Sequence, residues 1–293
     1  DVTVTLTLKD GKIVGCTATG DKETEGIGSK VIDSFPAIVA ESGSIAVDAI
    51  SGATVTSNAF VAAAEAALTE AGLNPEDYKT AIATAAGEDR TVDADVVVVG
   101  AGGAGMTAAI SAAADGLKVV VVESQAMVGG NSVRATGGMN AAKTTLQDKN
   151  TFGESAGVEI GGKGINNPEL VKTLCSNTAD SIVWLDSVGA SLTSVGAFGG
   201  ASVKRIHRPV NAEGKTLSVG AYIVPILEKN LQDAGVEIIL NTTVDTILTD
   251  ANGAACGVSG VANDGSKLTV NADAVILTTG GFGANLDMVV SYK

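Results

Sequence analysis

The stretch DVVVVGAGGAGMTAAISAAADGLKVVVVE, residues 95–123, decides the fold. A run of valines leads into a glycine-rich turn, a segment of small residues follows, and a second run of valines closes the stretch. Uninterrupted apolar runs of this length are typical of parallel strands that are buried on both faces. The stretch therefore predicts a strand, a helix and a second parallel strand, which places this part of the chain in the α/β class.

The turn reads Gly100-Ala101-Gly102-Gly103-Ala104-Gly105, a GxGxxG pattern between a predicted strand and a predicted helix. Glycines here permit a tight turn and let backbone N–H groups approach a pyrophosphate at the positive end of the helix. Glu123 ends the second strand, 18 residues after Gly105, where its carboxylate can accept hydrogen bonds from a ribose. An acceptor-only group favours a free 2′-hydroxyl over a 2′-phosphate. A glycine turn kept only for packing is the alternative.

The composition excludes several classes of protein. A net charge of −14 and 3% aromatic residues argue against nucleic acid as a partner, because such proteins need a basic surface and stacking aromatics. With 45% hydrophobic and 18% charged residues the chain is not of the disordered class. Cys16, Cys175 and Cys256 lie far apart and predict neither a zinc site nor a disulfide framework. The uncharged run 96–114 approaches the length of a membrane span, but the glycine turn inside it favours strand, turn and helix.

A smaller N-terminal domain is predicted before the α/β part. Residues 2–8 alternate apolar and polar side chains, turn at Asp10-Gly11 and resume at 12–16, which is the pattern of a β-hairpin. The hairpin is followed by a predicted glycine-bearing loop over 20–30 and then by a stretch of serine, glycine and aspartate residues that ends in DAISGATVTSNAF. A helix is predicted over 59–71, and its N-cap candidates and stop are Thr56, Ser57 and Gly72.

The rest of the chain supplies further elements and a boundary. The small, polar run 85–93 is predicted to be a linker, which divides the chain into domains 1–84 and 94–293. The other predicted elements are a short helix starting at Asn74-Pro75, helices over 166–190 and 218–234, and successive strands from 236 onward joined by Asn-Gly and Asp-Gly turns.

An extended set of motifs points to one flavoprotein family. The GxGxxG turn is followed at the expected spacing by Gly129-Gly130, and this resembles the FAD-binding signature of flavoproteins with two dinucleotide folds. The late stretch DAVILTTGG, residues 273–281, matches the segment with which such proteins return to the FAD. GGNS (129–132), GGMNAA (137–142), NNPELVK (166–172) and GGASVKRIHRP (199–209) resemble stretches of the soluble fumarate reductase, flavocytochrome c and urocanate reductase family.

The resemblance covers residues 94–293 and implies a Rossmann-like FAD-binding domain with two dinucleotide folds. It implies that Gly137 also lies near the substrate. The FAD contacts predicted from the resemblance and the glycine motifs are Gly100, Ala101, Gly102, Gly103, Ala104, Gly105, Glu123, Ser124, Gly130, Asn131, Ser132, Thr136, Gly137, Gly138, Val244, Thr279 and Gly280.

A second flavin is predicted in the N-terminal domain. The sequence DAISGAT, residues 48–54, resembles the flavinylation sequence of small α+β FMN-binding domains. In that family a flavin transferase joins FMN through its phosphate to the final threonine hydroxyl, here Thr54, as a phosphoester. Ser51, Gly52 and Ala53 are the small neighbours that admit the transferase. A loop that only caps the following helix is the alternative.

The implied activity is an electron path from an upstream donor through covalent FMN to FAD, and then as hydride to the double bond of a small unsaturated carboxylate. The alternatives are a flavin-carrying electron-transfer module without its own turnover, and a nicotinamide-dependent dehydrogenase. The family's flavin transferases act on exported proteins, and the chain opens without Met inside a strand pattern, so an extracytoplasmic protein with a trimmed N-terminus is expected.

No catalytic residue is assigned from the sequence. The resemblance implies that the capping domain, with the proton-donating arginine and the carboxylate-binding groups, lies beyond Lys293, so the FAD domain is expected to be incomplete. His207 could carry a proton, but a turn residue that packs and forms hydrogen bonds is the favoured interpretation. Arg205 and Arg208 are candidates for a carboxylate contact or for an ion pair.

Overall fold

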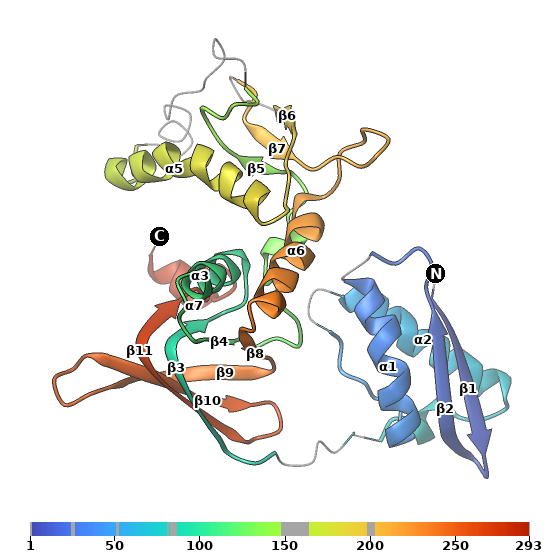
Figure 1. Ribbon diagram of the computed structural model, residues 1–293. Coiled ribbons are helices and arrows are strands. Elements are labelled where there is room, and N and C mark those ends of the chain that lie inside the picture. The colour runs from blue at the N-terminus through green and yellow to red at the C-terminus, as the bar shows by residue number, and fades with distance from the viewer. Residues whose placement is uncertain are drawn as a thin grey trace. The chain divides into compact units, whose positions relative to one another are not determined.

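A computed structural model describes residues 2–24, 27–50, 53–80, 82, 87–147, 164–197 and 203–292. The chain forms two compact units, of which one comprises Asp1–Gly130 with Ala234–Lys293 and the other comprises Asn131–Asp233 (Figure 1). The first unit is therefore discontinuous in sequence. Its two stretches are joined through a mixed β-sheet, as described below.

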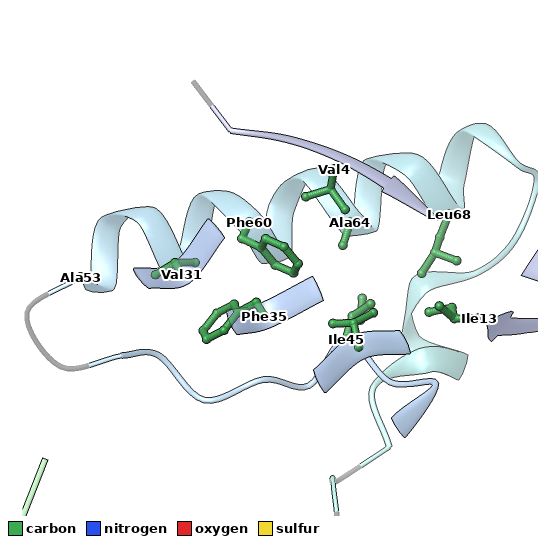
Figure 2. Packing of buried hydrophobic residues seen from close by; sticks show 10 residues of the cluster. Val4, Ile13, Val31, Phe35, Ile45, Ala53, Phe60, Ala64 and Leu68 are labelled. Atoms are coloured by element: carbon green, nitrogen blue, oxygen red, sulfur yellow. The ribbon is translucent and has the colours of Figure 1, made fainter. Parts of the chain in front are cut away.

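The N-terminal elements surround a hydrophobic core of their own. Strands β1 (Thr3–Lys9) and β2 (Lys12–Thr19) pair antiparallel, and Asp10 and Gly11 both adopt positive φ at the turn, as the Asp-Gly pattern predicts. The hairpin packs with helices α1 (Gly28–Ser42) and α2 (Thr54–Glu70), which are followed by the 3₁₀ helix η1 (Pro75–Tyr78). Phe35 and Phe60 meet edge to face in the centre of this core, with ring centroids 5.3 Å apart (Figure 2).

Two predictions for this region are wrong. Helix α1 begins inside the predicted loop and continues through a stretch for which no helix was predicted, because Val31, Phe35 and Val39 recur on one helical face and are buried there. Helix α2 begins at Thr54, so the N-cap is Ala53 rather than Thr56 or Ser57. The Ser57 hydroxyl instead donates to the Ala53 carbonyl and accepts from the Ile50 N–H, which uses its hydrogen-bonding capacity inside the first turns.

A six-stranded sheet forms the centre of the first unit. Its strand order is β8-β4-β3-β11-β10-β9. Strands β8, β4, β3 and β11 run parallel to one another, and β10 pairs antiparallel with both of its neighbours, β11 and β9. The valines of β3 and β4 are almost fully buried, as their apolar runs predict. The bounds are β3 (Arg90–Val99), β4 (Val119–Val122), β8 (Glu237–Ile239), β9 (Thr242–Thr249), β10 (Ala255–Ala262) and β11 (Lys267–Leu277).

Helix α3 (Gly103–Ala114) connects β3 to β4 and completes the predicted βαβ unit. The predicted Asn-Gly and Asp-Gly turns join β9 to β10 and β10 to β11, with positive φ at Gly253 and Gly265. Strand β3 already pairs with β11 from Arg90, inside the run predicted as a linker. A short helix, α7 (Leu286–Ser291), follows the sheet. The expectation of an α/β fold with a βαβ unit after the N-terminal hairpin and helices is confirmed.

The second unit is built around a small antiparallel sheet of order β5-β7-β6. The predicted helices appear as α5 and α6, and Gly220 of α6 lies so close to η2 that an added Cβ would be 2.0 Å from the Ser132 carbonyl oxygen. Among the described residues, no helix combines the length and apolar character that a membrane span needs. The bounds are η2 (Ser132–Arg134), β5 (Met139–Asn140), α5 (Pro168–Ser187), β6 (Ser194–Gly196), β7 (Ile206–Arg208) and α6 (Val219–Asp233).

Candidate flavin sites

The phosphate loop, defined here as Gly100–Gly105, leaves the end of β3 and enters the first turn of α3. Gly100 has φ +101°, and a Cβ on it would lie 2.7 Å from the Thr278 carbonyl oxygen. A Cβ on Gly105 would lie 1.8 Å from the Gly100 carbonyl oxygen, so the helix can approach the strand only with glycine here. A Cβ on Gly102 meets only the Gly129 carbonyl oxygen, at 4.0 Å, among the described residues. Gly102 therefore leaves the space through which a phosphate group can approach the helix N-terminus.

Glu123 contacts the phosphate loop through its carboxylate. Its side chain is buried, with 6% exposure, and one carboxylate oxygen accepts the Ala101 N–H at 2.7 Å. The other oxygen accepts the Gln125 N–H at 2.9 Å and the Ser124 hydroxyl at 3.2 Å. A carboxylate offers about four acceptor positions, so Glu123 retains capacity for a ribose hydroxyl. The contact of Glu123 with a ribose stays a prediction. The structure adds a second role for Glu123, which is to hold the phosphate loop through the Ala101 N–H.

The second glycine pair lies directly against the phosphate loop. Gly129 forms a parallel bridge with Gly102 and donates its N–H to the Ala101 carbonyl at 2.8 Å. Gly129 and Gly130 both have positive φ, which allows the backbone to reverse close to the loop. The structure thus brings together the loop, Glu123 and the glycine pair, which the sequence places in three separate segments.

Strands β9 and β11 bring further predicted residues toward this region. At the start of β9 the Thr242 N–H donates to the Glu123 carbonyl at 3.0 Å, two residues before the predicted contact Val244. Thr279 and Gly280 follow β11 and are exposed. The preceding residue, Thr278, is the one that bonds to the loop, and sequence reasoning missed it. The sequence feature that could have indicated Thr278 is its position as the polar residue directly after the apolar end of β11.

The other predicted FAD contacts belong to the second unit. Asn131, Thr136 and Gly137 are exposed, whereas Ser132 and Gly138 are half-buried. The Gly137 carbonyl accepts a hydrogen bond from Arg208 Nε, so Arg208 holds this backbone. Gly138 has φ +117°, and a Cβ there would collide with the Ile206 side chain at 2.2 Å.

His207 is a buried structural residue on β7, which is a strand and not the turn expected from the sequence. Its side chain is fully buried, and Nδ1 lies 2.9 Å from the Arg205 carbonyl. Because a carbonyl oxygen only accepts, Nδ1 carries a proton, and Nε2 lies 2.8 Å from the Thr144 hydroxyl oxygen. The predicted packing and hydrogen bonding are present.

The predicted FMN attachment residue, Thr54, is the first residue of α2 and is exposed. A phosphate on this hydroxyl would lie at the positive end of a 17-residue helix, which favours an anion. Ala53 is the N-cap of α2 and is buried, and its side chain has no group that could cap the helix. Ser51 and Gly52 lie outside the described residues.

One hydrogen bond ties the start of α2 to the segment before α1. Thr56, two residues beyond Thr54, donates its hydroxyl to the Glu23 carboxylate at 2.5 Å. A Cβ on Gly28 would lie 2.6 Å from that carboxylate, so glycine at the start of α1 makes room for the contact. The start of α2, with Thr54, is therefore held to the neighbouring segment.

A sheet whose glycine turn, buried carboxylate and second glycine pair converge at the carboxyl ends of its parallel strands defines the class of dinucleotide-binding α/β proteins. Comparison with known families agrees with this class. Residues 95–292 match the FAD binding domain, and residues 1–69 match the FMN-binding domain.

Individual relatives narrow the family. The chain is 43% identical over 200 residues to a fumarate reductase (cytochrome) of Shewanella frigidimarina, covering 67% of this chain and 34% of that protein. It is 31% identical to a urocanate reductase of Eggerthella lenta, over all of this chain and 49% of that protein. An open conformation of a flavocytochrome c3 fumarate reductase superposes with a TM-score of 0.62 at 33% identity, covering 69% of this chain and 36% of that one.

The chain belongs to the fumarate reductase and urocanate reductase family of FAD flavoproteins, and it carries an FMN-binding domain ahead of its FAD-binding domain. Its cofactors are accordingly FAD and FMN. The chain spans between a third and a half of the length of these relatives, 34% of one and 49% of the other.

Proposed function

We propose that this chain carries the flavins of a reductase for small unsaturated carboxylates such as fumarate or urocanate. When bound, FMN and FAD supply electron transfer and hydride transfer to the substrate double bond. The observation that carries the proposal is the combination of an exposed Thr54 at a helix N-terminus with a phosphate loop held by Glu123 in one chain. The names of the relatives supply the substrate class.

Thr54 is the proposed attachment residue for FMN. In a reaction performed by a flavin transferase, its hydroxyl oxygen would lose its proton to a base of the transferase and attack the FMN-side phosphorus of a flavin dinucleotide, whose pyrophosphate bond would break with release of the mononucleotide AMP. The first turn of α2 would stabilise the charge of the resulting phosphate. The Glu23 to Thr56 hydrogen bond would fix the backbone on the helical side of Thr54. An upstream donor would then reduce the bound FMN.

The FAD site would be formed by the residues predicted from the sequence, with Glu123 on the ribose and the phosphate loop on the pyrophosphate. The proposed domains are 1–84 for FMN and 94–293 for FAD, with 85–93 between them. We further propose an extracytoplasmic location, because flavin transferases of this type act on exported proteins.

The attachment is tested with Thr54→Ala, produced together with a flavin transferase. We expect complete loss of flavin fluorescence from the protein band in a denaturing gel, with FAD absorbance of the native protein retained. Thr54→Ser keeps a hydroxyl and should keep fluorescence. Thr69→Ala, near the other end of α2, is the matched control. Fluorescence that persists in the Thr54→Ala band would show that FMN is attached elsewhere.

The activity is tested by reoxidation of a reduced dye on addition of fumarate or urocanate. We expect reoxidation by one of these substrates, and slower reoxidation for Thr54→Ala when the dye donates only to FMN. A chain that binds both flavins but leaves the dye reduced with every enoate would be an electron-transfer module instead. Tight NAD binding without bound flavin would contradict both assignments.

A further inference from the structure

We propose that Thr278 is a positioning residue for FAD, which acts through the phosphate loop. Thr278 follows β11 directly, and its backbone N–H donates to the Val99 carbonyl at 2.8 Å. Its hydroxyl lies 2.8 Å from the Val99 carbonyl oxygen and 2.9 Å from the Gly100 carbonyl oxygen. One hydroxyl proton is therefore shared between the last residue of β3 and the first residue of the loop.

Thr278 and Glu123 both form hydrogen bonds with the peptide group that joins Gly100 to Ala101. The Gly100 carbonyl faces Thr278, and the Ala101 N–H of the same peptide donates to Glu123 at 2.7 Å. In a trans peptide the C=O and the N–H point in opposite directions. Thr278 and Glu123 thus fix the Gly100–Ala101 peptide plane from its two sides, and with it the direction in which the loop enters α3.

Steric contacts make the arrangement specific. A Cβ on Gly105 would lie 2.6 Å from the Thr278 hydroxyl oxygen, so the hydroxyl occupies the space that the third glycine of the motif leaves. A Cβ on Gly100 would lie 2.7 Å from the Thr278 carbonyl oxygen, so the backbone of Thr278 also contacts the loop. A side chain without the hydroxyl would fill the same space but would not fix the peptide plane.

The consequence is an effect on FAD affinity that is transmitted through the phosphate loop. The N–H groups of the first turn of α3 can bind a pyrophosphate only if the loop before them holds its direction. The hydroxyl acts on the phosphate end of the cofactor, so it should affect oxidised and reduced FAD equally. This inference needs FAD binding only and is independent of the proposed turnover.

The test compares Thr278→Val, which keeps the shape and loses the hydroxyl, with Thr278→Ser, which keeps the hydroxyl. FAD dissociation constants are measured on the full chain, after removal of bound FAD, by titration with FAD. We expect Thr278→Val to bind FAD about tenfold more weakly and Thr278→Ser to stay within about threefold of the original chain. Thr269→Val, in the middle of β11, is the matched control and should not change the dissociation constant.

The midpoint potential of the bound FAD separates positioning from a general structural effect and from contact with the flavin ring. We expect the same potential in Thr278→Val and in the original chain. Original affinity in Thr278→Val, equal losses in the Val and Ser variants, or a shifted potential would each overturn the proposal. If Thr278→Val does not fold, Thr278→Ala takes its place, and original FAD affinity in that variant would overturn the proposal as well.

Discussion

Cys16 on β2 shows how burial controls the chemistry of a single residue. Its side chain is half-buried and packs against the core of the N-terminal elements. Desolvation raises the pKa of the Cys16 thiol from 9.0 to about 11. Since the thiolate is the reactive form, Cys16 behaves at neutral pH as a small apolar side chain and not as a redox group.

This raised pKa predicts slow alkylation of Cys16. At pH 8 its thiolate fraction should be about a hundredfold smaller than that of a thiol with the ordinary pKa, because the shift is about two pH units. The rate of iodoacetamide labelling, followed by mass spectrometry of the Cys16 peptide, should therefore keep rising above pH 10. The same peptide in urea is the control, and its rate should level off near pH 9. A folded-state rate that levels off there too would contradict the prediction.

The sign of the linked effect on stability follows from the same shift. The folded chain favours the neutral thiol, so the contribution of Cys16 to stability is fully present below pH 9.0 and is lost as the pH rises towards about 11.

The sequence predicted the loop residues of the FAD site better than it predicted Thr278. The motif glycines and Glu123 belong to one local pattern of strand, turn and helix, so their spacing alone places them. Thr278 joins the site only because β11 pairs with β3, at a sequence separation of 178 residues from Gly100. No local pattern contains that pairing. Its role therefore becomes visible only in the folded chain.

At the scale of elements, the sequence prediction missed helix α1 entirely and placed the start of helix α2 too late in the chain. Pro36 and the flanking glycines and serines of α1 are typical of loops, and they concealed an apolar face of Val31, Phe35 and Val39. Burial against α2 outweighs the local preference, because most helical stability in proteins comes from packing. The hairpin and the βαβ unit were predicted because their turn residues and apolar periods agree with one another.

The packing of α1 on α2 predicts a large effect of Phe60→Ala. Phe60 is fully buried and meets Phe35 edge to face, so the variant should lose about 3–5 kcal/mol of stability in the N-terminal elements. Hydrogen exchange of peptides from β1, β2 and α1, measured by mass spectrometry, reports this local stability. Val55→Ala, on the same helix at an 85% exposed position, is the control and should change stability by less than about 0.5 kcal/mol. A loss below about 1 kcal/mol for Phe60→Ala would show that the core rearranges to fill the space.

At the scale of the whole molecule, two hydrophobic clusters among the described residues are distinct from each other. One joins the hairpin with α1 and α2, and the other joins the strands of the six-stranded sheet. A ligand stabilises the cooperative unit that binds it, so each flavin should stabilise its own core.

Removal of FAD should therefore weaken one core selectively. At an FAD concentration a hundredfold above the dissociation constant, bound FAD adds about 2.7 kcal/mol to the stability of the part that holds it. We expect peptides from α3 and β4 to exchange faster after FAD removal, and peptides from β1 and β2 to exchange at an unchanged rate. Addition of FAD should restore the original rates. An equal loss of protection in both regions would show that the two cores unfold together.

The pairing of β3 with β11 also has a consequence for synthesis of the chain. Arg90 pairs with Leu268, so the ribosome must add 178 residues after Arg90 before this partner on β11 exists, whereas β4, on the other side of β3, is complete at Val122. At about 5–20 residues per second this takes roughly 10–35 seconds. During that interval the valines of β3 and β4 cannot be covered by the completed sheet. The nascent chain should therefore need protection by chaperones until residues 255–277 emerge, and FAD can be bound by the completed sheet only after β11 has been synthesised.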